Sequence, residues 1–133
     1  MITEKLIAQL REHFPDRKVT FGAPPQPSAV FAAAHPEVGD LEIYDDGDEA
    51  TIVFQIGGHH HFSPPASKSI DEMEREIVED VVQFLTRLFA NRIVIWWGPT
   101  RQSGWVFREK LADKSFKRPN APLYVWSGPL IGE

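Results

Sequence analysis

The chain has 133 residues, of which 42% are hydrophobic and 25% are charged, and its formal net charge is −5. This length and composition predict a single globular domain over residues 1–133 and argue against wholesale disorder. The chain contains no cysteine, so its own side chains offer no disulfide bond, thiol nucleophile or cysteine-based zinc site.

The first helix is expected to begin at Thr3, a residue type that caps helix N-termini, and to end near Phe14, before Pro15. Residues 1–14 carry charges throughout and lack the apolar core of a signal peptide. No uncharged apolar run approaches the ~20 residues that span a bilayer. We therefore expect a cytoplasmic protein without a membrane segment. Short strands are expected at residues 19–21 and 29–34.

The dipeptide Asp46-Gly47 lies between two alternating segments and predicts the tip of a two-residue hairpin. This turn pairs Ile43 with Ala50 and Leu41 with Ile52, so these four apolar side chains share one face. We expect that face to contact a helix. The opposite face then carries Glu42, Tyr44, Glu49 and Thr51.

The pair Gly57-Gly58 indicates either a second tight turn or a bulge in one long strand, followed by a strand at residues 59–63. A long helix is expected over residues 69–90, because Ser69 and Glu72 form a capping-box pattern. Asn91 is expected to end this helix. Further short strands are expected at residues 92–97, 104–108 and 123–126.

These elements predict an α+β fold. We expect one antiparallel sheet of about five to seven short strands, with the long helix on one face and the N-terminal helix beside it.

The run His59-His60-His61 is the most distinctive chemical feature of the sequence. Alternate residues of a strand share a face, so His59 and His61 can point at one divalent transition metal such as zinc. Such a site needs a third ligand, for which the sequence offers His35, Asp40 and Glu42 without selecting among them. The alternative interpretation is a set of half-buried histidines that bind no metal, and no cofactor is then expected.

Two other regions have alternative interpretations. The acidic run over residues 45–49 superficially resembles a calcium loop, but its spacing fails the EF-hand pattern and indicates a solvated hairpin tip.

Tryptophans and arginines gather late in the chain, where an exposed tryptophan beside an arginine can anchor a ligand or a protein partner. The alternative is core packing. The candidate binding residues are Trp97, Arg101, Trp105 and Arg108.

Charge is unevenly distributed along the sequence. Residues 37–80 hold thirteen acidic and two basic residues, whereas residues 81–133 hold eight basic and three acidic residues. This pattern indicates either complementary faces within one fold or an acidic surface for a basic partner. It disfavours nucleic acid as a general partner, because phosphate binding requires a basic face.

The sequence lacks the phosphate-binding loop and the glycine motif that binds dinucleotides. It also lacks the nucleophile elbow of hydrolases and the zinc-binding motif of metalloproteases. The leading hypothesis is therefore a non-enzymatic binding or interaction domain that binds a protein partner or self-associates. By composition alone it is comparable to small acidic immunity-type modules. The alternative hypothesis is a small metal-dependent, hydrolase-like enzyme that uses His59 and His61.

Overall fold

The computed structural model describes residues 1–64, 69–98 and 103–131. The helices in this described part are α1 (Ile2–His13), α2 (Ile70–Phe89) and the short 3-10 helix η1 (Arg108–Ala112). The strands are β1 (Val19–Phe21), β2 (Ala29–Phe31), β3 (Leu41–Asp45), β4 (Ala50–Phe54), β5 (His59–Phe62), β6 (Ile93–Trp97), β7 (Ser103–Phe107), β8 (Leu123–Val125) and β9 (Gly128–Pro129).

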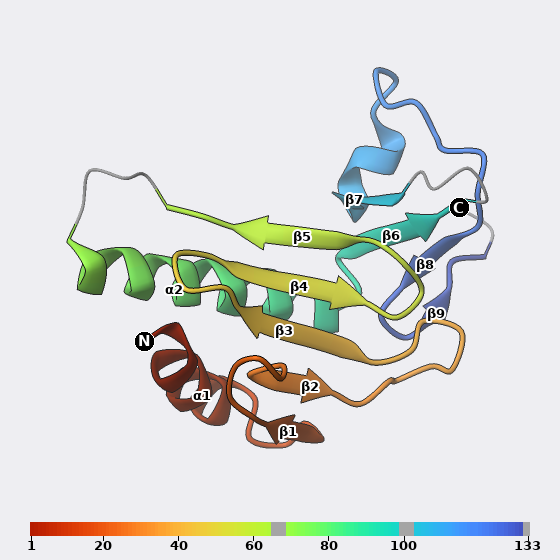
Figure 1. Cartoon of the computed structure of the whole chain (residues 1–133). Helices are drawn as coiled ribbons and strands as arrows, with labels where there is room; N and C mark the ends of the chain where they lie inside the picture. Colours follow the sequence, from red (N-terminus) through yellow and green to blue (C-terminus); the bar gives the residue numbers. More distant parts are fainter. Residues whose placement is uncertain (65–68, 99–102, 132–133) are drawn as a thin grey trace.

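The strands form two antiparallel sheets (Figure 1). The first has the order β1-β2-β3-β4-β5 and the second has the order β7-β6-β8-β9. The α+β class is confirmed, but the sequence suggested one sheet where the structure has two. Helix α2 returns the chain to the start of β5, where β6 and β7 pack against that strand through side chains without pairing with it.

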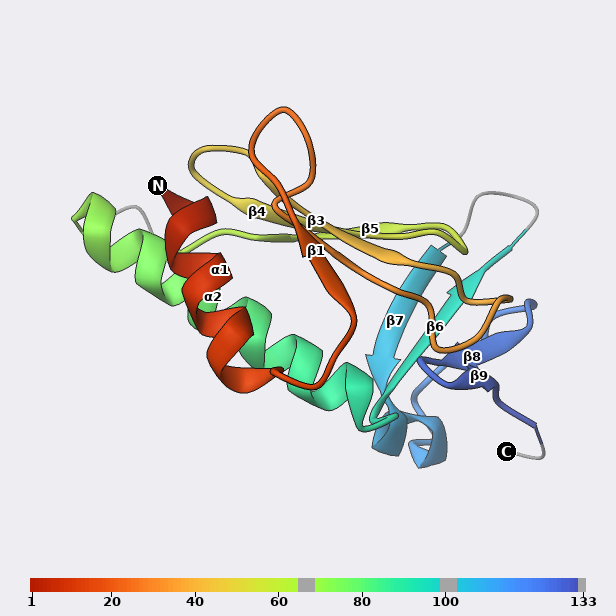
Figure 2. The ribbon, with the colours of Figure 1, turned by 90° about the horizontal axis from the view of Figure 1, so that it is seen from below.

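Both helices lie on the same face of the five-stranded sheet, and the second sheet lies near the C-terminal end of α2 (Figure 2). The main core is formed by the inner side chains of the first sheet and the apolar faces of α1 and α2. The inner face of β6 also joins this core through Ile93 and Ile95. None of the described helices is long and apolar enough to cross a membrane.

The turn between β4 and β5 packs against the second sheet through a glycine. Gly57 has a φ of +133°, and a Cβ atom at this position would lie 2.4 Å from Cδ2 of Trp97. A larger residue would therefore meet both backbone strain and a steric clash. This close approach fixes the position of β5 relative to β6 and β7.

Helix α2 has the predicted ends. The Ser69 hydroxyl accepts a hydrogen bond from the Glu72 backbone N–H at 3.3 Å, as expected of an N-cap. At the other end Asn91 adopts a left-handed conformation with φ 60°. The Arg92 N–H donates to the Arg87 carbonyl at 2.9 Å, and the Asn91 N–H donates to the Leu88 carbonyl at 3.0 Å. This pattern is a Schellman motif.

Helix α1 begins one residue before the predicted cap, so the assignment of Thr3 as N-cap was wrong. Thr3 lies inside the helix, and its backbone N–H and hydroxyl both donate to Oδ2 of Asp45, at 3.0 and 2.7 Å. A carboxylate from the end of β3 thus accepts a hydrogen bond from a backbone N–H of the first turn, which has no partner within the helix. The cap is supplied by a residue 42 positions away, which local sequence patterns do not reveal.

The β3–β4 hairpin has the predicted faces but a different register. Its central residues are Gly47 and Asp48, with Asp46 N–H donating to the Glu49 carbonyl at 2.9 Å, so Ile43 pairs with Ile52 and Leu41 with Phe54. Gly47 has φ 92°, and a type II′ turn places its positive-φ glycine first. The predicted register is therefore off by two residues, and an even shift leaves every side chain on its predicted face.

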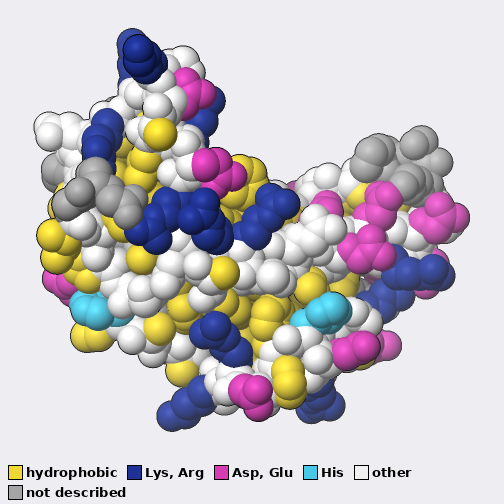
Figure 3. Space-filling model, turned by 180° about the vertical axis from the view of Figure 1, so that it is seen from behind, with side chains coloured by type: hydrophobic (Ala, Val, Ile, Leu, Met, Phe, Trp, Pro, Cys, Tyr) yellow, Lys and Arg dark blue, Asp and Glu magenta, His cyan; other side chains and the backbone are white. Residues whose placement is uncertain are grey.

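Charge is segregated in space as well as in sequence. Seen from behind, Lys and Arg side chains gather over the end that holds η1, and Asp and Glu side chains gather near the start of α2 (Figure 3). The acidic end is not continuous, because Lys5 contacts Glu74 at 2.8 Å and Asp71 at 3.4 Å. Arg75 also pairs with Asp71.

Candidate functional site

Strand β5 carries the three consecutive histidines and forms one edge of the five-stranded sheet. It follows a tight turn over residues 54–58, in which the Gly57 N–H donates to the Phe54 carbonyl at 3.0 Å. The chain therefore turns here, with the two glycines at the end of the turn, and β5 pairs with β4 as a separate strand. Because side chains alternate along a strand, His59 and His61 point to the outer face and His60 points to the inner face. The exposures agree, since His59 and His61 are exposed and His60 is half-buried.

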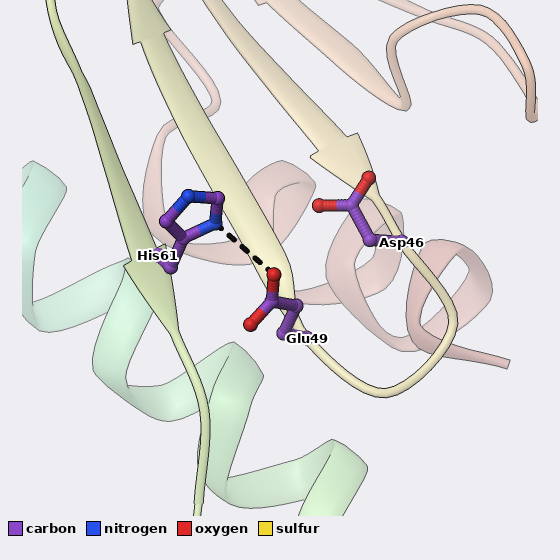
Figure 4. A group of neighbouring side chains, drawn as sticks. All are labelled: Asp46, Glu49 and His61. Atoms are coloured by element: carbon purple, nitrogen blue, oxygen red, sulfur yellow. Dashed lines mark ion pairs between the residues drawn. The ribbon is translucent and has the colours of Figure 1, made fainter.

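On the outer face, His61 is brought together with both acidic residues that flank the hairpin tip (Figure 4). Asp46 and Glu49 lie opposite each other across the turn, and His61 pairs with Thr51 on β4. One ligand atom from each of Asp46, Glu49 and His61 can be chosen so that all three lie within 4.8 Å of one another. We call these three residues and Thr51 the hairpin cluster.

Hydrogen bonds hold the hairpin cluster in place. His61 Nδ1 lies 3.1 Å from Glu49 Oε1 and 2.8 Å from Thr51 Oγ1. The Thr51 hydroxyl also donates to Asp46 Oδ2 at 2.5 Å, and the Ser63 hydroxyl donates to Glu49 Oε2 at 2.7 Å. Since the single Thr51 proton goes to Asp46, Thr51 accepts from a protonated Nδ1 of His61.

This geometry differs from a nucleophilic triad. In a triad the hydroxyl contacts one ring nitrogen of histidine and the carboxylate contacts the other. Here Thr51 and Glu49 both approach Nδ1 of His61, so the imidazole cannot relay a proton between them. The cluster offers one imidazole and two carboxylates close together at the surface.

The third-ligand candidates from the sequence lie elsewhere in the described fold. His35 lies beside Gly128, Asp40 accepts from the Ala33 N–H at 2.8 Å, and Glu42 accepts from the Tyr44 hydroxyl at 3.1 Å. The sequence did bring His59 and His61 together correctly, since their rings are 4.9 Å apart between centroids. It did not connect Asp46 and Glu49 with His61, although the predicted hairpin already placed Glu49 on the face of Thr51.

On the inner face, His60 belongs to an aromatic cluster. Its ring stacks on Phe84 at 5.9 Å and lies edge-on to Phe62 and Trp105 at 4.7 and 5.2 Å between centroids. Burial lowers the pKa of His60, and the neighbouring His61 and His59 lower it further. His60 is therefore uncharged at neutral pH and lies in apolar surroundings. Its neighbours His59 and His61 lie in polar surroundings.

A groove of about 150 Å³ opens beside this cluster, between β5, α2 and β7. We call it the aromatic groove, and it is lined by His60, Phe62, Asp80, Gln83, Phe84, Arg87, Trp105 and Phe107. Burial raises the pKa of Asp80, and repulsion from Glu76 and Glu79 adds to this effect. Arg87 lies over the Phe107 ring at 4.8 Å.

The candidate binding residues that the structure describes do not all line one pocket. Trp105 lines the aromatic groove, whereas Trp97 is 38% exposed and covers the Gly57 turn. Arg108 donates to the Asn91 carbonyl at 3.2 Å, behind the end of α2. Arg101 lies outside the described residues.

Comparison with known proteins gives no relative from which a role can be transferred. No protein-family profile, no curated protein and no solved structure matches the chain. The functional argument therefore depends on the geometry of the two faces of β5.

Proposed function

We propose that the protein is a non-enzymatic interaction domain that binds an extended segment of a protein partner. The segment lies along the edge of β5 that does not pair with β4. The observation that carries the proposal is the aromatic groove, which lies directly beside this strand edge. Its volume of about 150 Å³ is below the ~300–1,000 Å³ of typical small-molecule sites. It suits one inserted side chain.

The backbone of β5 supports strand addition. The Phe54 N–H donates to the Gly58 carbonyl at 3.1 Å, which makes this a hydrogen-bonded pair of the antiparallel ladder. Such pairs alternate, so His60 and Phe62 bond to β4, while the N–H and C=O groups of His59 and His61 face outward. An added strand can bond to these groups and direct alternate side chains into the aromatic groove.

Two charged side chains line the groove, Arg87 and Asp80. Arg87 lies over the Phe107 ring, so the choice of a basic partner segment depends on Asp80. Asp80 makes no ion pair among the described residues, and its nearest charged neighbours on α2 are also acidic. A cation placed here gains favourable electrostatic energy on binding. We therefore expect the bound segment to carry an apolar side chain next to a lysine or arginine.

A random peptide library displayed on phage tests this proposal. We expect enrichment of peptides with an apolar residue beside a basic one, and the affinity of a synthetic peptide should fall at least tenfold in Trp105→Leu and several-fold in Asp80→Asn. Glu79→Gln, next to Asp80 but outside the groove, is the matched control and should bind as the wild type does. Circular dichroism of each variant checks that the fold is retained.

Backbone pairing has its own test. Two peptides are compared, one N-methylated at its odd-numbered amides and one at its even-numbered amides. Only one of them should lose binding, because only one set of amides faces β5. Absence of enriched peptides, or affinity unchanged in both Asp80→Asn and Trp105→Leu, would refute the proposal. Concentration-dependent dimerisation that is lost in Trp105→Leu would instead identify a second copy of the chain as the partner.

A further inference from the structure

We infer that Asp46, Glu49 and His61 form a binding site for one divalent transition-metal ion. The site goes beyond the proposed peptide binding, because it lies on the outer face of β5 rather than in the aromatic groove. It also differs from the pair His59 and His61 that the sequence suggested, since the structure supplies two carboxylates from the hairpin tip.

The fold builds this site from three adjacent strand ends. The turn at Gly47 and Asp48 sets Asp46 opposite Glu49, and the β4–β5 pairing sets His61 opposite Thr51. Glu49 lies directly before β4 and two positions from Thr51, so the two side chains share a face. The three ligands therefore converge because of strand register, without a contribution from loop residues beyond the turn.

The distances are close to those of a metal site. Ligand atoms bound to one ion at about 2.0–2.2 Å lie roughly 3–3.5 Å from one another. The distance of 3.1 Å between His61 Nδ1 and Glu49 Oε1 already fits. Asp46 needs only a small side-chain rotation, since all three ligand atoms lie within 4.8 Å of one another and Asp46 is exposed.

The ligand types select the class of metal. One imidazole nitrogen with two carboxylate oxygens suits zinc, manganese, iron or nickel, whereas calcium and magnesium prefer oxygen ligands alone. Coordination requires Nδ1 of His61 to give up its proton, so the bound imidazole carries its proton on Nε2. Three protein ligands leave at least one position for water.

Thr51 is a positioning residue for this site. Only 7% of its surface is exposed, and its hydroxyl contacts both Asp46 and His61. Hydrogen-bond partners of metal ligands fix the orientation of those ligands. Its hydroxyl can keep the bond to Asp46 when a metal takes Nδ1 of His61.

Isothermal titration of tag-free, chelator-treated protein with zinc chloride tests the inference. We expect one zinc ion per chain. The dissociation constant should rise at least tenfold in His61→Ala and in Asp46→Asn. In ¹⁵N NMR spectra of the wild type, zinc should shift Nδ1 of His61 and leave the resonances of the aromatic groove unchanged.

Two neighbouring substitutions are matched controls. Asp48→Asn lies on the same turn but outside the cluster, and His59→Ala removes the adjacent imidazole; both should change the zinc affinity less than threefold. No binding at millimolar zinc would overturn the inference. Loss of binding in His59→Ala with normal binding in Asp46→Asn would also overturn it, in favour of a two-histidine site. The titration uses no peptide, so its outcome is independent of the proposed function.

Discussion

The two faces of β5 place the same residue type in opposite environments. His61 lies among carboxylates and a hydroxyl on the outer face, while His60 lies among Phe62, Phe84 and Trp105 on the inner face. Only the alternation of side chains along the strand separates them. The difference shows that the chemistry of a histidine run is decided by what the neighbouring strands and helix place against each face.

The energetic roles of the two faces should differ as well. The inner face excludes water and joins β5 to α2 and β7, so it should contribute most to stability. The outer face is more polar and, apart from the buried Thr51, more open, so its exposed side chains should be nearly neutral for folding and available for binding. Three substitutions test this comparison, in order of decreasing effect.

The largest effect is expected for Phe84→Ala. Phe84 is 5% exposed and contacts the rings of His60, Phe62 and Trp105. Its truncation should lower the free energy of unfolding by about 3–5 kcal/mol, through lost burial and a cavity. Urea unfolding measures this, and Gln83→Ala on the same helix should change stability by at most about 0.5 kcal/mol. Equal losses in the two variants would show that the aromatic cluster is not the stabilising face.

An intermediate effect of opposite sign is expected for Asp80→Asn. The pKa of Asp80 is raised in the native state, so the native state binds more protons than the unfolded state as this group titrates. Its contribution to stability is therefore full below the unfolded pKa, near 3.9, and is lost as pH rises through the native pKa. Asp80→Asn should be more stable than the wild type at pH 7.

The same comparison at about pH 3.5 isolates this titration. Asp71, Glu74 and Asp113 have lowered pKa values, and their protonation destabilises wild type and variant alike. The stability difference caused by Asp80 should then nearly vanish. A difference that is independent of pH would mean that the carboxylate charge is not its cause. A gain in stability together with weaker peptide binding would indicate that Asp80 serves binding at the expense of folding.

The smallest effect is expected on the outer face, for Glu42→Ala. Glu42 is half-buried and accepts one hydrogen bond from Tyr44, so its loss should change the free energy of unfolding by no more than about 0.5 kcal/mol. Ile52, which precedes Val53, the cross-strand partner of Glu42, is fully buried on the inner face, and Ile52→Ala should cost about 2–5 kcal/mol. If Glu42→Ala were the more damaging change in urea unfolding, the assignment of the two faces would be reversed.

The sequence by itself determined the local features of this protein. The periodicity and the caps at Ser69 and Asn91 predicted α2 almost to the residue, and alternation predicted which side chains of the β3–β4 hairpin face the core. It also placed His59 and His61 on one face. Each of these features depends on residues close together in the chain, where backbone geometry alone fixes the arrangement.

Only the tertiary structure decided what those features meet. The hairpin register depended on which turn residue takes a positive φ, and the N-terminal cap came from Asp45 across the fold. The division into two sheets depended on where α2 returns the chain. The contact of His61 with the hairpin and the aromatic groove depend on strand pairing and helix packing between residues 10 or more positions apart. Such contacts are set by the packing of the whole chain, because no short segment contains both partners.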